Sequence, residues 1–123
     1  MDFNKKNIAI IGLGYVGLPL AVEFGKNLST VGFDINKLRI DELKTGVDKT
    51  LEVAEVSMKE AVNLRFSYDT KDLIDCEIYI ITVPTPIDDA KRPDLSAIIK
   101  ASEMVAKVLK EGDIVIYLSL IHI

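Results

Sequence analysis

The sequence has few of the residues on which several classes of protein depend. Its 123 residues include one cysteine, one histidine and no tryptophan. A single cysteine excludes an intramolecular disulfide and gives no sign of a thiolate metal cluster. Cys76 lies between Asp75 and Glu77, whose charges raise a thiol pKa, so we expect it to be structural. His122 stands in an apolar stretch near the last residue, and we expect no catalytic or metal-binding role for it.

Positive charge is not in excess either. Lysine and arginine number 15 against 19 aspartate and glutamate, which gives a formal net charge of −4. This balance argues against nucleic acid or an anionic membrane as a partner. No apolar run approaches the length of a membrane span, and residues 1–6 lack the apolar core of a signal peptide. We therefore expect one soluble domain in the cytoplasm.

What the sequence does contain is a glycine motif between an apolar run and a helical pattern. Residues 8–11 read Ile-Ala-Ile-Ile and predict a strand buried on both faces. Gly12, Gly14 and Gly17 follow in the order G-x-G-x-x-G, and residues 18–24 have the apolar spacing of a helix. Strand, glycine turn and helix occur in this order in dinucleotide-binding units.

Each glycine meets a different steric demand. Gly12 lets the chain turn sharply out of the strand, Gly14 lets the backbone approach a pyrophosphate, and Gly17 lets the helix pack closely on the strand. We expect the N–H groups of residues 13–16 to be free, so that with the helix dipole they form an anion site.

An acidic residue follows at the distance that this motif requires. Asp34 ends the predicted strand 30–34 and lies 20 residues after Gly14. A carboxylate there hydrogen-bonds a ribose 2′-hydroxyl and would repel a 2′-phosphate, which favours NAD over NADP. Arg39 follows five residues later, where it could either reach the adenosine end of the cofactor or remain a solvated helix residue. Its spacing leaves both interpretations open.

The rest of the chain alternates between predicted helices and strands. We expect a helix over 35–44 with Ile35, Leu38 and Leu43 on its apolar face, and another from Asp94 to about Gly112. Helical spacing is also present over 52–62 and 69–74, and strands are predicted over 64–67, 77–83 and 113–117. The alternation predicts an α/β fold, a doubly wound parallel sheet of the Rossmann type.

The predicted strand 77–83 runs directly into Pro84, Thr85 and Pro86. In an open parallel sheet, ligands bind beyond the carboxyl ends of the strands. Thr85 would therefore face the cofactor cleft, unless these residues only end the strand.

These motifs resemble the N-terminal NAD-binding domain of the UDP-glucose/GDP-mannose dehydrogenase family. The resemblance covers about residues 6–117 and is carried by residues 11–19, 32–36 and 83–86. The segment 87–96 is most similar to the branch that acts on UDP-N-acetylhexosamines (GalNAc or ManNAc) in Vi-type polysaccharide biosynthesis. The resemblance implies an oxidoreductase that converts the C6 alcohol of a UDP-sugar to a carboxylate, through a cysteine-linked intermediate and with two NAD.

The resemblance also implies roles for individual residues. Tyr15 and Val16 would present their backbone to the pyrophosphate, Asp34 and Arg39 would hold the adenosine ribose, and Thr85 would lie near the nicotinamide ribose. The full set of expected cofactor-binding residues is Gly12, Gly14, Tyr15, Val16, Gly17, Asp34, Arg39, Val83, Pro84 and Thr85.

The sequence departs from the family pattern after the last predicted strand. Leu118 and Leu120 stand where the family has glutamate and threonine, and that threonine contributes to the nicotinamide site. Cys76 does not match the family's nucleophilic cysteine. We therefore expect 1–117 to be an incomplete NAD-binding domain, 118–123 an atypical tail, and the chain to contain no catalytic residue and to show no turnover. We also expect self-association through the apolar strand 114–117 and the tail.

Two other functions would use the same glycine turn and acid. One is an NAD-responsive ligand-sensing module, as in ion transport regulators, and the other is the NAD domain of a β-hydroxyacid-type dehydrogenase. The segment 83–86 and the polar loop after it speak against the sensing module.

Overall fold

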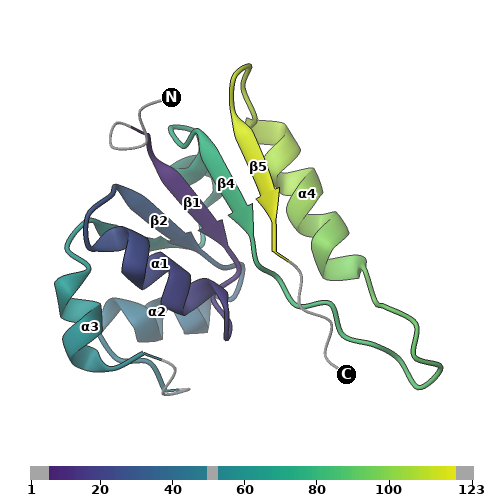
Figure 1. Ribbon diagram of the computed structural model, residues 1–123, viewed down its shortest axis with the longest axis horizontal. Helices are drawn as coiled ribbons and strands as arrows, with labels where there is room; N and C mark the ends of the chain where they lie inside the picture. Colours follow the sequence, from purple (N-terminus) through teal and green to yellow (C-terminus); the bar gives the residue numbers. More distant parts are fainter. Residues whose placement is uncertain (1–5, 50–52, 119–123) are drawn as a thin grey trace.

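The computed structural model describes residues 6–49 and 53–118 (Figure 1). The strands are β1 (Ile8–Ile11), β2 (Thr30–Phe33), β3 (Leu64–Ser67), β4 (Ile78–Ile81) and β5 (Ile114–Tyr117). The helices are α1 (Gly17–Gly25), α2 (Lys37–Lys44), α3 (Glu55–Glu60), the short 3₁₀ helix η2 (Thr70–Leu73) and α4 (Ser96–Val108). No helix of this described part is both long enough and apolar enough to cross a bilayer.

The strands form a single parallel sheet in the order β3-β2-β1-β4-β5. The chain winds outward from β1 to β3 on one side and from β4 to β5 on the other, which confirms the doubly wound Rossmann arrangement. Ile11 pairs with both Phe33 and Ile81, so β1, β2 and β4 end level with one another. The residues that follow these strands therefore meet at one edge of the sheet, at the switch point where ligands bind in such folds.

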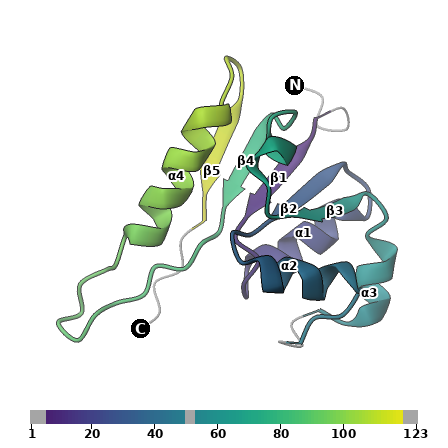
Figure 2. The same cartoon turned by 180° about the vertical axis from the view of Figure 1, so that it is seen from behind.

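Side chains of β1 and β4 are buried on both faces of the sheet, as the apolar runs predict. Because successive side chains point to opposite faces, Ile8, Ile10, Ile78 and Ile80 pack with α1, α2 and α3. Ala9, Ile11, Tyr79 and Ile81 pack instead with Ala101 and Val105 of α4. Figure 2 shows α4 beside β5 and β4, away from the group formed by α1, α2 and α3.

Helix α2 differs from its sequence prediction in both its start and its buried face. The Asn36 side chain accepts a hydrogen bond from the Arg39 N–H, so the helix begins at Lys37. Its buried residues are Ile40 and Leu43, whereas Ile35 and Leu38 are 75% and 79% exposed. The assignment of Ile35 and Leu38 to the apolar face is therefore wrong.

Helices α3 and α4 are shorter than their apolar patterns suggest. The Asp94 carboxylate accepts hydrogen bonds from the N–H and hydroxyl of Ser96, so it closes the loop just ahead of α4. The loop between β4 and α4 extends away from the sheet (Figure 1), and a bridge between Ile87 and Pro93 joins its two arms. Along the outer edge of β5, Ile116 and Tyr117 are 40% and 52% exposed.

Candidate cofactor-binding site

The turn after β1 is fixed to both neighbouring strands. Gly12 has φ +101°, a conformation that favours glycine, and its N–H donates to the Phe33 carbonyl at 2.8 Å. The Gly12 carbonyl accepts from the Thr82 hydroxyl at 2.7 Å. A Cβ at Gly12 would lie 3.0 Å from Cγ1 of Val83. A side chain at this position would therefore be strained in its backbone and crowded against Val83.

The other two glycines differ sharply in their surroundings. A Cβ at Gly17 would lie 1.7 Å from the Gly12 carbonyl oxygen and 2.5 Å from Oγ1 of Thr82. Helix α1 therefore begins in direct contact with the turn. A Cβ at Gly14 would meet no atom within 4 Å. Open space lies in front of Gly14, which is where a ligand could approach the backbone.

Free N–H groups line the entrance to α1. Among the described residues, no acceptor is within hydrogen-bond range of the N–H groups of Gly14, Tyr15, Val16 and Gly17. Together with the partial positive charge at the helix N-terminus, they form a site for an anion. The Tyr15 side chain is 69% exposed and does not fill this site.

Leu13 is an exception to the expected free groups. Its N–H donates to Oδ2 of Asp34 at 3.0 Å, while Oδ1 of Asp34 accepts from the Asn36 N–H at 2.9 Å. The expectation that the Leu13 N–H is free is therefore wrong. Asp34 sits at the carboxyl end of β2 as predicted, with one carboxylate oxygen bonded to the glycine turn.

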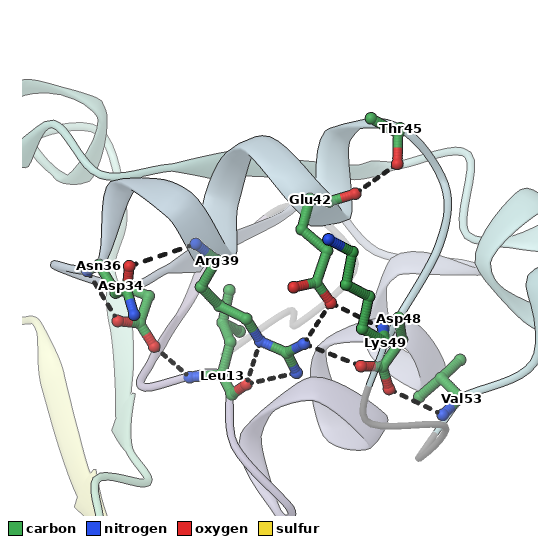
Figure 3. A network of polar contacts seen from close by, with 9 residues as sticks. All are labelled: Leu13, Asp34, Asn36, Arg39, Glu42, Thr45, Asp48, Lys49 and Val53. Carbon is green, nitrogen blue, oxygen red and sulfur yellow. Dashed lines mark hydrogen bonds and ion pairs between the residues drawn. The ribbon is translucent and has the colours of Figure 1, made fainter.

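Arg39 also contacts Leu13, from the other side of the turn (Figure 3). Its Nε and Nη2 donate to the Leu13 carbonyl at 3.1 and 2.9 Å. Its Nη1 donates to Glu42 at 2.9 Å and to Asp48 at 2.8 Å. The Arg39 side chain is only 11% exposed, so the interpretation of a solvated helix residue is wrong.

A cavity of about 610 Å³ opens beside the turn, a volume typical of small-molecule sites. Its walls come from the turn, the end of β2, the start of the loop after β4 and one face of α4. Six of the expected cofactor-binding residues line it, namely Gly12, Gly14, Asp34, Arg39, Val83 and Pro84. The cavity, the open space at Gly14 and the free N–H groups together fit the adenosine and pyrophosphate of a dinucleotide.

The remaining expected residues lie outside the cavity lining. Tyr15, Val16 and Gly17 belong to the turn itself, where their backbone rather than their side chains is available. Thr85 is 3% exposed and is not among the residues that line this cavity, so its expected place near the nicotinamide ribose stays a prediction. The sequence did not point to Thr82, whose hydroxyl bonds a carbonyl 70 residues away. It did not point to Asp48 either, although the partners of Asp48, Arg39 and Val53, are nine and five residues away.

Cys76 lies away from this site and is buried. Burial, with a smaller contribution from the charge of Glu77, raises the pKa of its thiol to about 11. A thiol with this pKa is almost fully protonated at neutral pH, as a structural cysteine would be. In the described ranges no group of three or more His, Cys, Asp or Glu residues could hold a metal ion, and His122 lies outside those ranges.

Comparison with known proteins gives a consistent result. The family model described as "UDP-glucose/GDP-mannose dehydrogenase family, NAD binding domain" matches residues 6–123. UDP-N-acetyl-D-glucosamine 6-dehydrogenase of Pseudomonas aeruginosa is 58% identical over 115 residues, which are 94% of this chain and 27% of that protein. The protein of the same name from Salmonella typhi is 59% identical over 97% of this chain and 28% of its own length.

Among solved structures, a UDP-D-ManNAc dehydrogenase from Pyrococcus horikoshii superimposes with a TM-score of 0.84 at 33% identity. The match covers 92% of this chain and 28% of that one. The chain thus spans little more than a quarter of the length of the relatives it matches.

Proposed function

The chain belongs to the UDP-glucose/GDP-mannose dehydrogenase family, and from this premise we propose that it binds NAD as the cofactor domain of a nucleotide-sugar 6-dehydrogenase. One observation carries the proposal above the others. Gly14, with its free N–H and the open space in front of it, and the carboxylate of Asp34 line a single cavity, and the other free N–H groups at the start of α1 follow Gly14 directly. These are the elements that a dinucleotide requires at the switch point of such a sheet.

In this proposal the pyrophosphate accepts hydrogen bonds from the N–H groups of residues 14–17. The adenosine occupies the cavity, with its ribose hydroxyls on Asp34. The dinucleotide then runs past Val83 and Pro84, and its nicotinamide ribose lies near Thr85. Bound NAD supplies the hydride acceptor, and the residues of this chain bind and orient it.

Selection of NAD over NADP follows from the charges at the ribose end. Asp34 carries a negative charge, and the Arg39 guanidinium that lines the cavity is already paired with two carboxylates, those of Glu42 and Asp48. A 2′-phosphate on a ribose held by Asp34 would therefore meet the negative charge of that carboxylate, which opposes its binding, while the other cation of the lining, Lys100, lies on α4. Asp34 would repel it most directly.

For the whole protein we propose oxidation of the C6 alcohol of a UDP-N-acetylhexosamine to a uronate with two NAD, in polysaccharide biosynthesis. The names of the relatives, UDP-N-acetyl-D-glucosamine 6-dehydrogenase among them, support this substrate class. The 123 residues themselves are proposed to be inactive, with 1–117 as the cofactor domain and 118–123 as a tail of different character. Membership of the family speaks against the sensing module and the β-hydroxyacid-type dehydrogenase alike.

Calorimetric titration of the chain with NAD and NADP tests the cofactor proposal. We expect NAD to bind more tightly, and Asp34→Asn to weaken NAD binding about tenfold while narrowing the difference from NADP. Asp41→Asn is the matched control, since this carboxylate on α2 is 50% exposed and outside the cavity. Tighter binding of NADP by the unaltered chain would refute the role given to Asp34.

Location in the cytoplasm and self-association through β5 are also proposals. Exposure of Ile116 and Tyr117 on an edge strand supports pairing with a second copy of the chain. Analytical ultracentrifugation should show a fraction of dimer that increases with protein concentration. A monomer at every concentration tested would contradict the proposed self-association.

A further inference from the structure

The buried carboxylate of Asp48 enters the cofactor proposal only as an ion-pair partner of Arg39. Its side chain is fully buried, with 0% exposure, and it does not line the cavity. We propose that Asp48 is a positioning residue for the cofactor, which acts through Arg39 to set the direction of the Gly14 N–H. The inference rests on the proposed NAD site and assigns a role to a residue that cannot touch NAD.

The peptide unit that joins Leu13 to Gly14 is planar. The Leu13 carbonyl and the Gly14 N–H belong to the same planar group, so fixing one fixes the direction of the other. Two N–H groups of Arg39 converge on the Leu13 carbonyl, at 3.1 and 2.9 Å. Arg39 thereby determines where the first free N–H of the anion site points.

Arg39 is in turn held in place by two carboxylates. A guanidinium has five N–H donors, and Arg39 directs two to Leu13 and two from Nη1 to Glu42 and Asp48. The Glu42 side chain is 16% exposed, whereas that of Asp48 is fully buried. A buried charge is costly without its partner, so the pair of Arg39 with Asp48 is the more strongly coupled one.

Asp48 is itself anchored by a backbone N–H. Its Oδ2 accepts a hydrogen bond from the Val53 N–H at 3.1 Å, while Oδ1 faces Arg39. The carboxylate thus connects the segment after α2, through Arg39, to the glycine turn (Figure 3). Asp34 binds the N–H of Leu13 on the opposite side of that residue, so the turn is held in shape before any ligand arrives.

The substitution Asp48→Asn tests this role. It keeps the size of the side chain but removes the charge, and it replaces one carboxylate oxygen with an NH₂ group. Since an NH₂ group is a donor, the asparagine side chain can no longer accept one hydrogen bond on each side, from Arg39 and from Val53. We expect amide hydrogen exchange at Leu13 to accelerate about tenfold in the ligand-free chain. Arg39 would hold the Leu13 carbonyl less firmly, so the turn would open more often and expose the Leu13 N–H that is otherwise bonded to Asp34. The dissociation constant for NAD should rise about tenfold as well, measured well below the unfolding temperature.

Asp113→Asn is the matched control. Asp113 is also a buried carboxylate, 4% exposed and 3.2 Å from Lys110, but it precedes β5 at the opposite edge of the sheet. This control should lower thermal stability while leaving both Leu13 exchange and the NAD dissociation constant unchanged.

Unchanged Leu13 exchange and NAD affinity in a folded Asp48→Asn chain would overturn the inference. If that variant does not fold, Arg39→Lys decides, because one ammonium cannot bridge the Leu13 carbonyl and both carboxylates. Wild-type affinity for NAD in folded Arg39→Lys would equally refute it. Failure of the unaltered chain to bind NAD refutes the proposed function instead, and Leu13 exchange then still decides whether Asp48 orders the turn.

Discussion

Alanine at Gly17 should lower the stability of the fold, whereas alanine at Gly14 should lower the affinity for NAD and leave the fold intact. At Gly17 the new Cβ would lie 1.7 Å from the Gly12 carbonyl oxygen, so α1 has to move away from the sheet by more than 1 Å. This displacement loosens the packing of Leu18, Ala21 and Val22, all of which are at most 1% exposed. Losing about half of the burial free energy of the larger side chains destabilises the fold by roughly 3 kcal/mol.

Alanine at Gly14 introduces no such contact, since a Cβ there meets nothing within 4 Å. Gly14 is also not among the glycines with positive φ. The substitution should leave the free energy of unfolding unchanged or raise it by about 0.5 kcal/mol, because the unfolded chain loses conformational freedom. The added methyl occupies the path of the pyrophosphate, so the NAD dissociation constant should rise at least about tenfold.

Urea unfolding followed by circular dichroism measures the first effect, and calorimetric titration with NAD measures the second. The reasoning predicts a loss of stability only for Gly17→Ala and, among folded chains, a loss of affinity for Gly14→Ala. Equal stability of Gly17→Ala and the unaltered chain would refute the packing argument. Unaltered NAD affinity in Gly14→Ala would show that the pyrophosphate lies elsewhere.

Two further predictions concern the opposite edge of the sheet. Cys76 should resist alkylation at pH 8 until the chain unfolds, and mass spectrometry after timed exposure to iodoacetamide measures this. Burial raises the pKa of the Cys76 thiol from 9.0 to about 11. The contribution of the protonated thiol to the free energy of unfolding is therefore complete below pH 9 and is lost as the pH rises toward 11. Cys76→Ala should flatten that part of the pH profile, and an unchanged profile would contradict the assignment. Tyr79→Phe should cost about 1–2 kcal/mol in urea unfolding, because the Tyr79 hydroxyl donates to the buried carbonyls of Leu73 and Cys76 at 2.8 and 2.9 Å. Tyr68→Phe, at a side chain 43% exposed, should be neutral, and an equal loss in both variants would refute this reasoning.

The sheet could be predicted from sequence because its central strands are short apolar runs. The segments Ile8–Ile11 and Ile78–Ile81 are apolar at every position, which is the pattern of a strand covered on both faces. Helix α2 was harder, because an eight-residue helix has few positions from which to infer a period. Ile35 precedes the helix, and Leu38 lies two residues before Ile40, on a different side of the helix. Neither therefore shares the core-facing side of Ile40 and Leu43.

In the candidate site, some residues could be recognised from their spacing in the sequence and others could not. The three glycines and Asp34 could be recognised because their spacing along the chain reflects the geometry of one strand–turn–helix unit. Asp48 could not, because a carboxylate soon after a helix usually belongs to a solvated loop. It is buried against Arg39, nine residues earlier, and Arg39 in turn bonds the Leu13 carbonyl in the turn after β1.

The residues proposed to select the cofactor and those proposed to shape its site are bonded to the same residue, Leu13. Asp34 bonds the Leu13 N–H and would also bind the ribose, while Arg39 bonds the Leu13 carbonyl and is held by Asp48. Replacing Asp34 to admit a 2′-phosphate would therefore also release one side of the turn. It would not free Arg39 to pair with the new phosphate, because Glu42 and Asp48 still neutralise its charge. In the proposed site, cofactor preference and turn geometry are therefore coupled, and we expect a change of preference to require substitutions on both sides of Leu13.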